Sequence, residues 1–235
     1  SRDSYYTGVA EGVVGYDRII KMLEVRNDEL LIEEKGLHSI EKFLVSRYLM
    51  YAQVYLHKTS LVAEKMLKMT IERVKYLLNN GENVEMADQL KTLLTGDPIT
   101  ASEEGIMELF SSLDDIDVWD LLKKNRNHAD PVLSYLCTGL VDRRLSKIVI
   151  GGGDTAWQDK EALAIKIATE MGLTEKDASF VIVAGEEKIT AYSEAKTSIR
   201  FLQRDGEVVP FSQQTGLSEA LFKDKPMKYL IYPRN

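Results

Sequence analysis

The sequence predicts an α+β protein in which a mainly α-helical N-terminal region precedes a ferredoxin-like α/β sandwich lobe. Residues 39–78 contain neither proline nor glycine, and their apolar residues recur at helical spacing. After about residue 145, short β-rich segments and glycine-containing turns replace that pattern. We therefore expect two domains, a helical one over residues 1–145 and the sandwich lobe over residues 146–235.

The helical domain is predicted to open with a hairpin and a very long helix. A short helix over residues 16–22 leads into two β-rich runs around a polar turn, which predict a small hairpin at 23–32. Residues 39–78 fit one very long helix or two helices joined at a kink, and Gly81 ends the pattern.

Several shorter helices are predicted over residues 84–142. Asp114 or Asp115 can accept hydrogen bonds from the free N–H groups at the start of one of them. Asp130 precedes Pro131, a residue suited to the first helical position because its missing N–H would be unpaired there. These residues fix where two of the helices should begin.

The second domain shows the element order β-α-β-β-β-α-β, a split-βαβ pattern with an added hairpin. An amphipathic helix is expected over residues 159–171, ended by Gly172, and a short helix at 218–222. Strands are expected at residues 147–150, 180–183, 198–203, 207–211 and 229–232.

Composition and charge narrow the function classes. No apolar run is long enough to span a membrane, and we expect no signal peptide. The single Cys137 favours a reducing cytoplasm. Residues 38–80 carry seven basic against three acidic residues, whereas residues 81–120 carry one against eleven. This contrast argues against a general nucleic-acid binder and fits a local site for a small anion. A merely solvated acidic surface is the alternative.

The run from Arg47 to Lys58 carries the strongest binding signal. At about 100° per residue, Arg47, Tyr51, Tyr55 and Lys58 fall within an arc of roughly 80° on one helix face. Such a face suits a sugar phosphate, because arginine forks onto phosphate oxygens and tyrosine packs against a ring. Core aromatics, ion-paired cations and a packed or capping His57 are the competing interpretations.

Other motifs argue against a complete catalytic centre in this segment. The three histidines lack the spacing of a metal site, and no Gly-x-Ser-x-Gly nucleophile motif is present. Gly151–Gly153 follows a predicted strand, but Asp154 and Asp159 would repel phosphate, which favours a simple connector. We expect no catalytic residue and no metal ligand here.

Two segments carry a family resemblance. Ser1–Gly8 and residues 40–58 resemble the HD-superfamily deoxynucleoside triphosphate triphosphohydrolases, in the branch of the sterile-alpha-motif/HD-domain enzyme and its bacterial relatives. In that family the helical core ends in Asp-Arg-x-Asp-Tyr-x-x-Arg-Asp, and this chain starts at the final Arg2-Asp3. The resemblance extends well over residues 1–75 and loosely to 145, so it implies the remainder of an HD core followed by an accessory lobe.

The resemblance implies roles for individual residues. Asp3 would bond the deoxyribose 3′-hydroxyl, Arg47 would contact the triphosphate, and Tyr55 would pack where a 2′-hydroxyl would otherwise lie. Lys58 would contact substrate or, as in some members, a regulatory nucleotide. Tyr5 and Tyr6 stand where the family often has histidine, which puts a proton-transfer role there in doubt. The expected substrate-binding residues are Asp3, Arg47, Tyr51, Tyr55, His57 and Lys58.

The resemblance also implies that the family's metal-binding residues would precede Ser1. The expectation is therefore the C-terminal part of an enzyme that cleaves a dNTP into deoxynucleoside and triphosphate, using Mg, Mn, Fe or Zn held elsewhere. This segment alone is expected to be inactive, and the parent to form a homo-oligomer. Another phosphorylated substrate, or a non-catalytic regulatory or oligomerisation module, remains open, and single-stranded nucleic-acid binding is a weak alternative.

Overall fold

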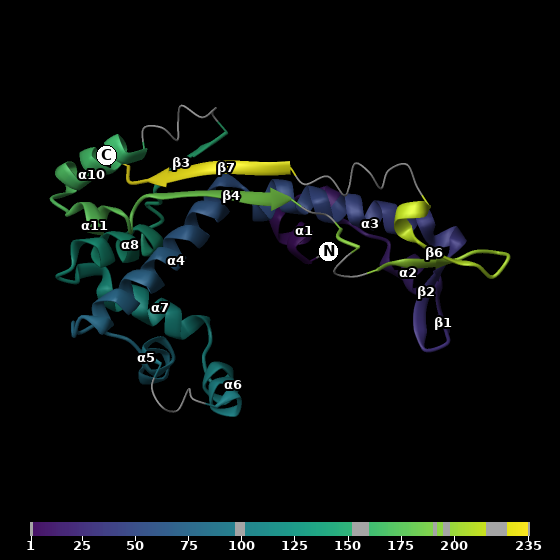
Figure 1. Ribbon diagram of the computed structural model, residues 1–235, viewed down its shortest axis with the longest axis horizontal. Coiled ribbons are helices and arrows are strands. Elements are labelled where there is room, and N and C mark those ends of the chain that lie inside the picture. The colour runs from purple at the N-terminus through teal and green to yellow at the C-terminus, as the bar shows by residue number, and fades with distance from the viewer. Residues whose placement is uncertain are drawn as a thin grey trace. The chain divides into compact units, whose positions relative to one another are not determined.

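The computed structural model shows a mixed α+β protein, which confirms the predicted fold class (Figure 1). The residues it describes are 2–96, 102–151, 160–189, 192–194, 198–214 and 225–234. The chain forms two compact units, unit 1 from Ser1–Ser60 with Glu186–Met227 and unit 2 from Leu61–Gly185 with Lys228–Asn235. Each unit thus combines segments of both domains expected from the sequence. No helix among the described residues is long and apolar enough to cross a membrane.

Unit 1 begins with short helices and the predicted hairpin. The hairpin turn consists of Asn27 and Asp28, whose φ angles of 52° and 61° are typical of a two-residue type I′ turn. The elements in order are α1 (Arg2–Thr7), the 3-10 helix η1 (Ala10–Gly12), α2 (Tyr16–Lys21), β1 (Leu23–Arg26), β2 (Glu29–Glu33), the 3-10 helix η2 (Glu34–Gly36) and α3 (Leu37–Met50).

The hairpin extends into a four-stranded sheet with the order β1-β2-β5-β6. Strand β2 pairs in parallel with β5 (Arg200–Leu202), and β5 pairs antiparallel with β6 (Val208–Pro210), which precedes the turn η6 (Phe211–Gln213). Gly206, at φ 90°, lies in the turn between β5 and β6. The predicted second hairpin therefore exists, but it joins the N-terminal hairpin.

The core of unit 1 explains this joining. Phe201 and Phe211 are fully buried, and both pack with Tyr192 against Ile40 and Leu44 on one face of α3. The rings of Tyr192 and Phe211 meet edge to face at 5.6 Å. Burial of these aromatics ties Tyr192, Phe201 and Phe211 to the N-terminal elements.

A π-helical turn, η3 (Tyr51–Tyr55), separates α3 from α4 (Lys58–Asn79). The N–H of Leu56 donates to the carbonyl of Tyr51 at 2.8 Å, a bond that spans five residues instead of four. Of the two sequence interpretations, the structure supports two helices joined at a break. The assumption of an unbroken α-helix through residues 47–58 is wrong.

Unit 2 is built around the rest of α4. Asp114 accepts from the N–H of Ile116 within a capping box, and Asp130 accepts from the N–H of Leu133 with Pro131 next to it, so both predicted caps are confirmed. The helical elements are α5 (Asp88–Thr95), α6 (Glu103–Ser111), α7 (Asp115–Lys124), η5 (Asn125–Asn127), α8 (Pro131–Val141), α10 (Lys160–Met171) and α11 (Glu175–Ala178).

The sheet of unit 2 has the order β3-β7-β4, built from β3 (Lys147–Ile150), β4 (Val183–Ile189) and β7 (Lys225–Tyr232). Strands β4 and β7 run on into the residues of unit 1. The strands expected in one ferredoxin-like sheet thus lie in two sheets, because β5 and β6 pair with the N-terminal hairpin. This corrects the sandwich expected over 146–235; the helix predicted at 218–222 lies outside the described residues.

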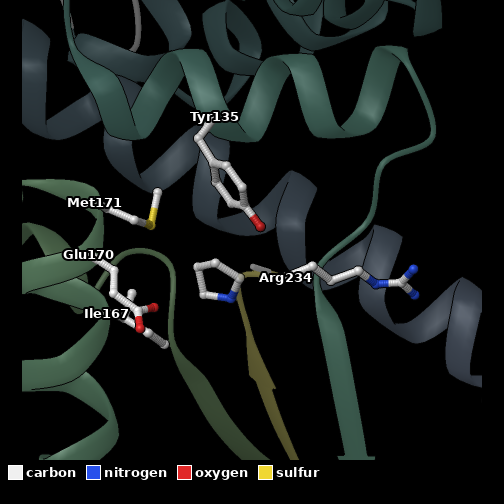
Figure 2. Close-up of a pocket in the computed structure, with 6 residues that line it drawn as sticks. Tyr135, Ile167, Glu170, Met171 and Arg234 are labelled. Carbon is white, nitrogen blue, oxygen red and sulfur yellow. The ribbon is translucent and has the colours of Figure 1, made fainter.

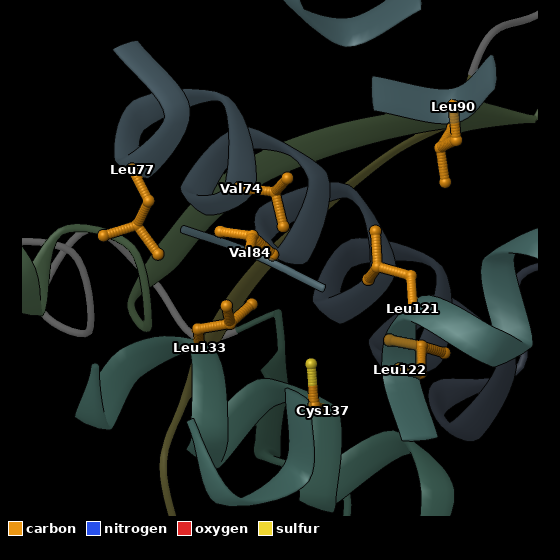
Figure 3. Packing of buried hydrophobic residues seen from close by; sticks show 8 residues of the cluster. All are labelled: Val74, Leu77, Val84, Leu90, Leu121, Leu122, Leu133 and Cys137. Carbon is orange, nitrogen blue, oxygen red and sulfur yellow. The ribbon is translucent and has the colours of Figure 1, made fainter. Parts of the chain in front are cut away.

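Apolar side chains from several helices meet in the core of unit 2 (Figure 3). Helix α4 presents Val74 and Leu77 at a spacing of three residues, which places them on one helix face. The cluster consists of Val74, Leu77, Val84, Leu90, Leu121, Leu122, Leu133 and Cys137.

One cation lies inside unit 2. The Arg73 side chain is 4% exposed, and its guanidinium forks onto Asp130 with N···O distances of 2.5 and 3.1 Å. A third N–H donates to Asp177 at 2.6 Å. The rings of Tyr76 and Phe180 each lie 4.9 Å from the guanidinium carbon. Arg73 therefore ties α4 to the start of α8 and to α11.

Candidate functional site

The end of α3 and the π-helical turn bring Arg47, Tyr51 and Tyr55 together in unit 1. The Arg47 guanidinium carbon lies 5.5 Å from the centre of the Tyr51 ring. The rings of Tyr51 and Tyr55 meet edge to face with centres 5.1 Å apart. These contacts form a continuous row that begins with an exposed cation.

Asp3 completes this row from α1. The Tyr55 hydroxyl donates to Asp3 Oδ2 at 2.5 Å, a contact between residues 52 positions apart. This hydrogen bond, followed by partial burial and the negative charge of Asp3, raises the pKa of Tyr55. Ser4 is buried and its hydroxyl donates to the carbonyl of Val9, which holds α1 in place.

A pocket of about 310 Å³ lies beside Arg47, Tyr51 and Tyr55. A Cβ added to Gly12 would lie 2.6 Å from Met50 Sδ and 2.8 Å from Ser4 Cβ, so only glycine fits at this wall. The lining residues are Gly12, Val14, Phe43, Ser46, Arg47, Met50, Tyr51 and Tyr55.

Three of these lining residues, Arg47, Tyr51 and Tyr55, were predicted from the sequence, and the other five were not. Phe43 precedes Arg47 by four residues on α3, so helical spacing could have found it. Gly12 and Val14 come from a separate short segment near η1, and no local pattern links them to α3.

His57 and Lys58 have other surroundings than the prediction assumed. The backbone N–H of Thr59 donates to His57 Nδ1 at 3.3 Å, so His57 caps the start of α4, as one sequence interpretation allowed. Lys58 is the first residue of α4 and is exposed. Neither belongs to the pocket lining among the described residues. For Lys58 the reason is the π-helical turn, which changes the angular spacing on which the single-face prediction rested.

Potential metal ligands are scattered in the described part of the chain, where no group of three or more His, Cys, Asp and Glu side chains could hold a metal ion. His38 Nδ1 lies 2.8 Å from Glu41 Oε2 on the same helix. His128 Nε2 lies 2.9 Å from the carbonyl of Asn83.

Unit 2 contains a second hollow of about 420 Å³ (Figure 2). The Tyr135 hydroxyl lies 2.9 Å from Ser146 Oγ, and burial raises its pKa. Figure 2 shows the Arg234 guanidinium extending away from Glu170 and Met171. Since its polar groups do not converge, this hollow is a weaker candidate. The lining residues are Tyr135, Ile167, Glu170, Met171, Pro233 and Arg234.

Comparisons with known sequences give a consistent family pattern. The model of the HD-associated region matches residues 14–225. The uncharacterized protein YwfO of Bacillus subtilis is 26% identical over all of this chain and 54% of its own length. The uncharacterized protein MG461 of Mycoplasma genitalium is 32% identical over 48% of this chain and 28% of its own length.

Solved structures extend this pattern. A phosphohydrolase from Bacteroides thetaiotaomicron superposes with a TM-score of 0.84 at 37% identity, over 99% of this chain and 59% of that chain. A hypothetical protein from Aquifex aeolicus gives a TM-score of 0.64 at 19% identity over 99% of this chain and 52% of its own, which shows the fold alone. The chain spans between half and three fifths of the length of YwfO and of these two solved structures.

Proposed function

We propose, because this chain belongs to the HD-associated region family, that it is the substrate-binding part of a metal-dependent HD phosphohydrolase. The likeness to a phosphohydrolase at 37% identity supports a role related to that enzyme class. The single observation that carries the proposal is the contact row Arg47–Tyr51–Tyr55–Asp3 beside a pocket.

The row offers three kinds of contact in sequence. Arg47 is exposed, and its guanidinium can fork onto phosphate oxygens while it rests on the Tyr51 ring. The Tyr55 ring offers an apolar face to a sugar. Asp3 Oδ2 accepts from Tyr55, which leaves acceptor capacity on its other oxygen for a sugar hydroxyl. Together they fit a phosphorylated sugar.

The finer proposal is a deoxynucleoside triphosphate as substrate. Arg47 would bind the triphosphate, Asp3 would accept a hydrogen bond from the 3′-hydroxyl, and the Tyr55 ring would occupy the space that a 2′-hydroxyl needs. Water would attack the α-phosphorus, and the products would be deoxynucleoside and triphosphate. His57 and Lys58 would contribute from the start of α4, His57 by holding the backbone and Lys58 by positive charge.

The divalent metal, Mg, Mn, Fe or Zn, would be held by residues other than the described ones, since these contain no suitable group of ligands. When bound, it would supply an activated water. The chain's own part is to bind and orient the substrate by Arg47, Tyr55 and Asp3.

The test is a kinetic comparison in the full-length protein that contains this chain. Arg47→Ala should lower kcat/KM for dNTPs by about 10- to 100-fold, because a charge-assisted hydrogen bond contributes about 1.5–3 kcal/mol. Inorganic triphosphate should be the product. Arg126→Ala is a matched control, since Arg126 is partly exposed and pairs with Asp142 in unit 2.

Unchanged kinetics in Arg47→Ala would reject the assignment of this pocket. Release of a different phosphorylated product would support the assignment of the pocket but show that the substrate is not a dNTP. Absence of any phosphohydrolase activity in the full-length protein, with normal assembly, would favour the regulatory or oligomerisation module instead.

A further inference from the structure

Strand β1 forms one edge of the four-stranded sheet in unit 1. In an antiparallel pair, alternate residues turn their N–H and C=O groups toward the partner. The two-residue turn makes Arg26 and Glu29 the closing hydrogen-bonded pair, so Arg26 and Glu24 face β2. The backbone groups of Leu23 and Val25 therefore point outward from the sheet edge.

The edge also carries an exposed apolar face. Val25 pairs with Leu30, so the two side chains lie opposite each other on the same face. Val25 is 67% exposed and Leu30 is 63% exposed. Farther from the turn, Ile32 lies on this same face and is buried in the core of unit 1, so the face is open only near the turn, at Val25 and Leu30. Unpaired edges with exposed apolar side chains favour pairing with another strand.

The charges on β1 identify what that strand would be. Glu24 and Arg26 flank Val25 and point to the opposite face from it. If a second β1 pairs antiparallel about a two-fold axis at Val25, each Glu24 lies opposite the Arg26 of the second copy. The sequence Glu-Val-Arg is thus complementary to itself in reverse. Within one strand Arg26 Nε donates to Glu24 Oε1 at 2.7 Å, so the four side chains of two copies would form one cluster of alternating charges.

We propose that two copies of this chain associate through β1, antiparallel, with Val25 opposite Val25 of the second copy. In this register each Val25 exchanges two backbone hydrogen bonds with its counterpart, since its N–H and C=O point outward. The exposed side chains form one row across four strands, Leu30, Val25 and then Val25 and Leu30 of the second copy. Only four residues form β1, so the contact is a weak one that depends on protein concentration.

Cysteine cross-linking of the full chain under mild oxidation tests this register. Val25→Cys should give a covalent dimer, because opposite residues of a hydrogen-bonded pair have Cα atoms about 5.5 Å apart, within disulfide reach. Leu30→Cys is the matched control, equally exposed on the same face. Its copies would lie about 14 Å apart across three strand spacings, beyond disulfide reach. The natural Cys137 is buried and does not compete.

Charge reversal then tests the pairing itself. In the Val25→Cys background, Glu24→Arg places Arg opposite Arg, and Arg26→Glu places Glu opposite Glu, so each should reduce dimer formation about tenfold. The double variant restores opposite charges and should restore cross-linking. Val25, Arg26 and Leu30 are exposed and Glu24 is half-buried, and unchanged circular dichroism confirms folding of each variant.

Three outcomes would overturn the proposal. The first is a Val25→Cys protein that stays uncross-linked at high concentration. The second is equal cross-linking of Leu30→Cys, which would show random collision. The third is cross-linking of the double variant that is as low as in the two single reversals. This would show that Glu24 of one copy does not face Arg26 of the second copy.

Discussion

Unit 1 and unit 2 each contain an arginine that contacts a nearby tyrosine on its own chain segment, yet the two arginines have different surroundings. Arg73 of unit 2 contacts Tyr76 and is buried, with two aspartates around its guanidinium. Arg47 of unit 1 contacts Tyr51 and is exposed, and no carboxylate among the described residues lies within ion-pair distance. The same local pattern therefore supports two different roles.

The difference lies in how many donors are already used. A guanidinium has five N–H groups, and Arg73 directs three of them to Asp130 and Asp177 while aromatic rings cover it. Arg47 keeps its donors for solvent or a ligand. An arginine whose donors are filled by its own protein stabilises the fold, whereas an exposed one beside a pocket is suited to binding.

The largest expected effect comes from Arg73→Ala. Removing this cation leaves Asp130 and Asp177 without their buried partner, which should lower the free energy of unfolding by about 3–5 kcal/mol. Urea unfolding measures the change. Arg73→Lys keeps the positive charge but loses the two-pronged contact with Asp130, so its free energy of unfolding should lie between those of Arg73→Ala and wild type. Equal stability of Arg73→Ala and wild type would refute the structural role.

A smaller effect is expected from pH at Asp177. Hydrogen bonds from Thr174, then the Arg73 contacts, lower the pKa of Asp177. A lowered folded-state pKa gives stability that is present above the unfolded value of about 4 and is lost as pH falls through the folded value. Acid unfolding of Asp177→Asn should therefore depend less on pH in this range. An unchanged acid dependence would contradict the prediction.

In unit 1, Asp3→Asn should lower the pKa of Tyr55 toward its ordinary value. The hydrogen bond to Asp3, which is the main cause of the raised pKa, would lose its charged acceptor. The raised pKa gives stability below pH of about 10 that is lost as Tyr55 ionises. Ultraviolet titration, with Tyr55→Phe subtracted to isolate this residue, measures the shift. The stability change should be at most about 1 kcal/mol.

The smallest change in stability is expected for Arg47→Ala, within about 0.5 kcal/mol of wild type. The side chain is exposed, and its contact with the Tyr51 ring is replaceable by water. Thermal unfolding of Arg47→Ala beside Arg73→Ala provides the direct comparison. A loss in Arg47→Ala as large as in Arg73→Ala would remove the distinction between the two arginines.

Local chemistry allowed much of the fold to be predicted. The capping residues Asp114 and Asp130 and the hairpin turn at Asn27 and Asp28 act through neighbours in the sequence, so the residues alone indicated them. The division of strands between two sheets depends on Phe201 and Phe211 packing against α3, about 150 residues away in sequence. No local pattern contains that information.

The candidate site follows the same rule. The spacing of Arg47, Tyr51 and Tyr55 placed them together, and the structure confirms their contacts. Lys58 was grouped with them because a regular helix was assumed, and His57 because the run from Arg47 to Lys58 resembles the HD family. In a π-helical turn the backbone hydrogen bonds span five residues instead of four. The residue types of Tyr51–Tyr55 do not indicate which of these two patterns forms.

That turn also constrains changes in chain length. A π-helical turn holds one residue more than an α-helical turn, so one deletion within Tyr51–Tyr55 would restore a regular turn with little rotation of the residues on either side. Loss of Ala52, Gln53 or Val54 should therefore keep Tyr55 near Arg47. Loss of Tyr51 or Tyr55 would instead remove a ring from the row of contacts. The turn can accommodate a shorter chain at its three middle residues and not at its two tyrosines.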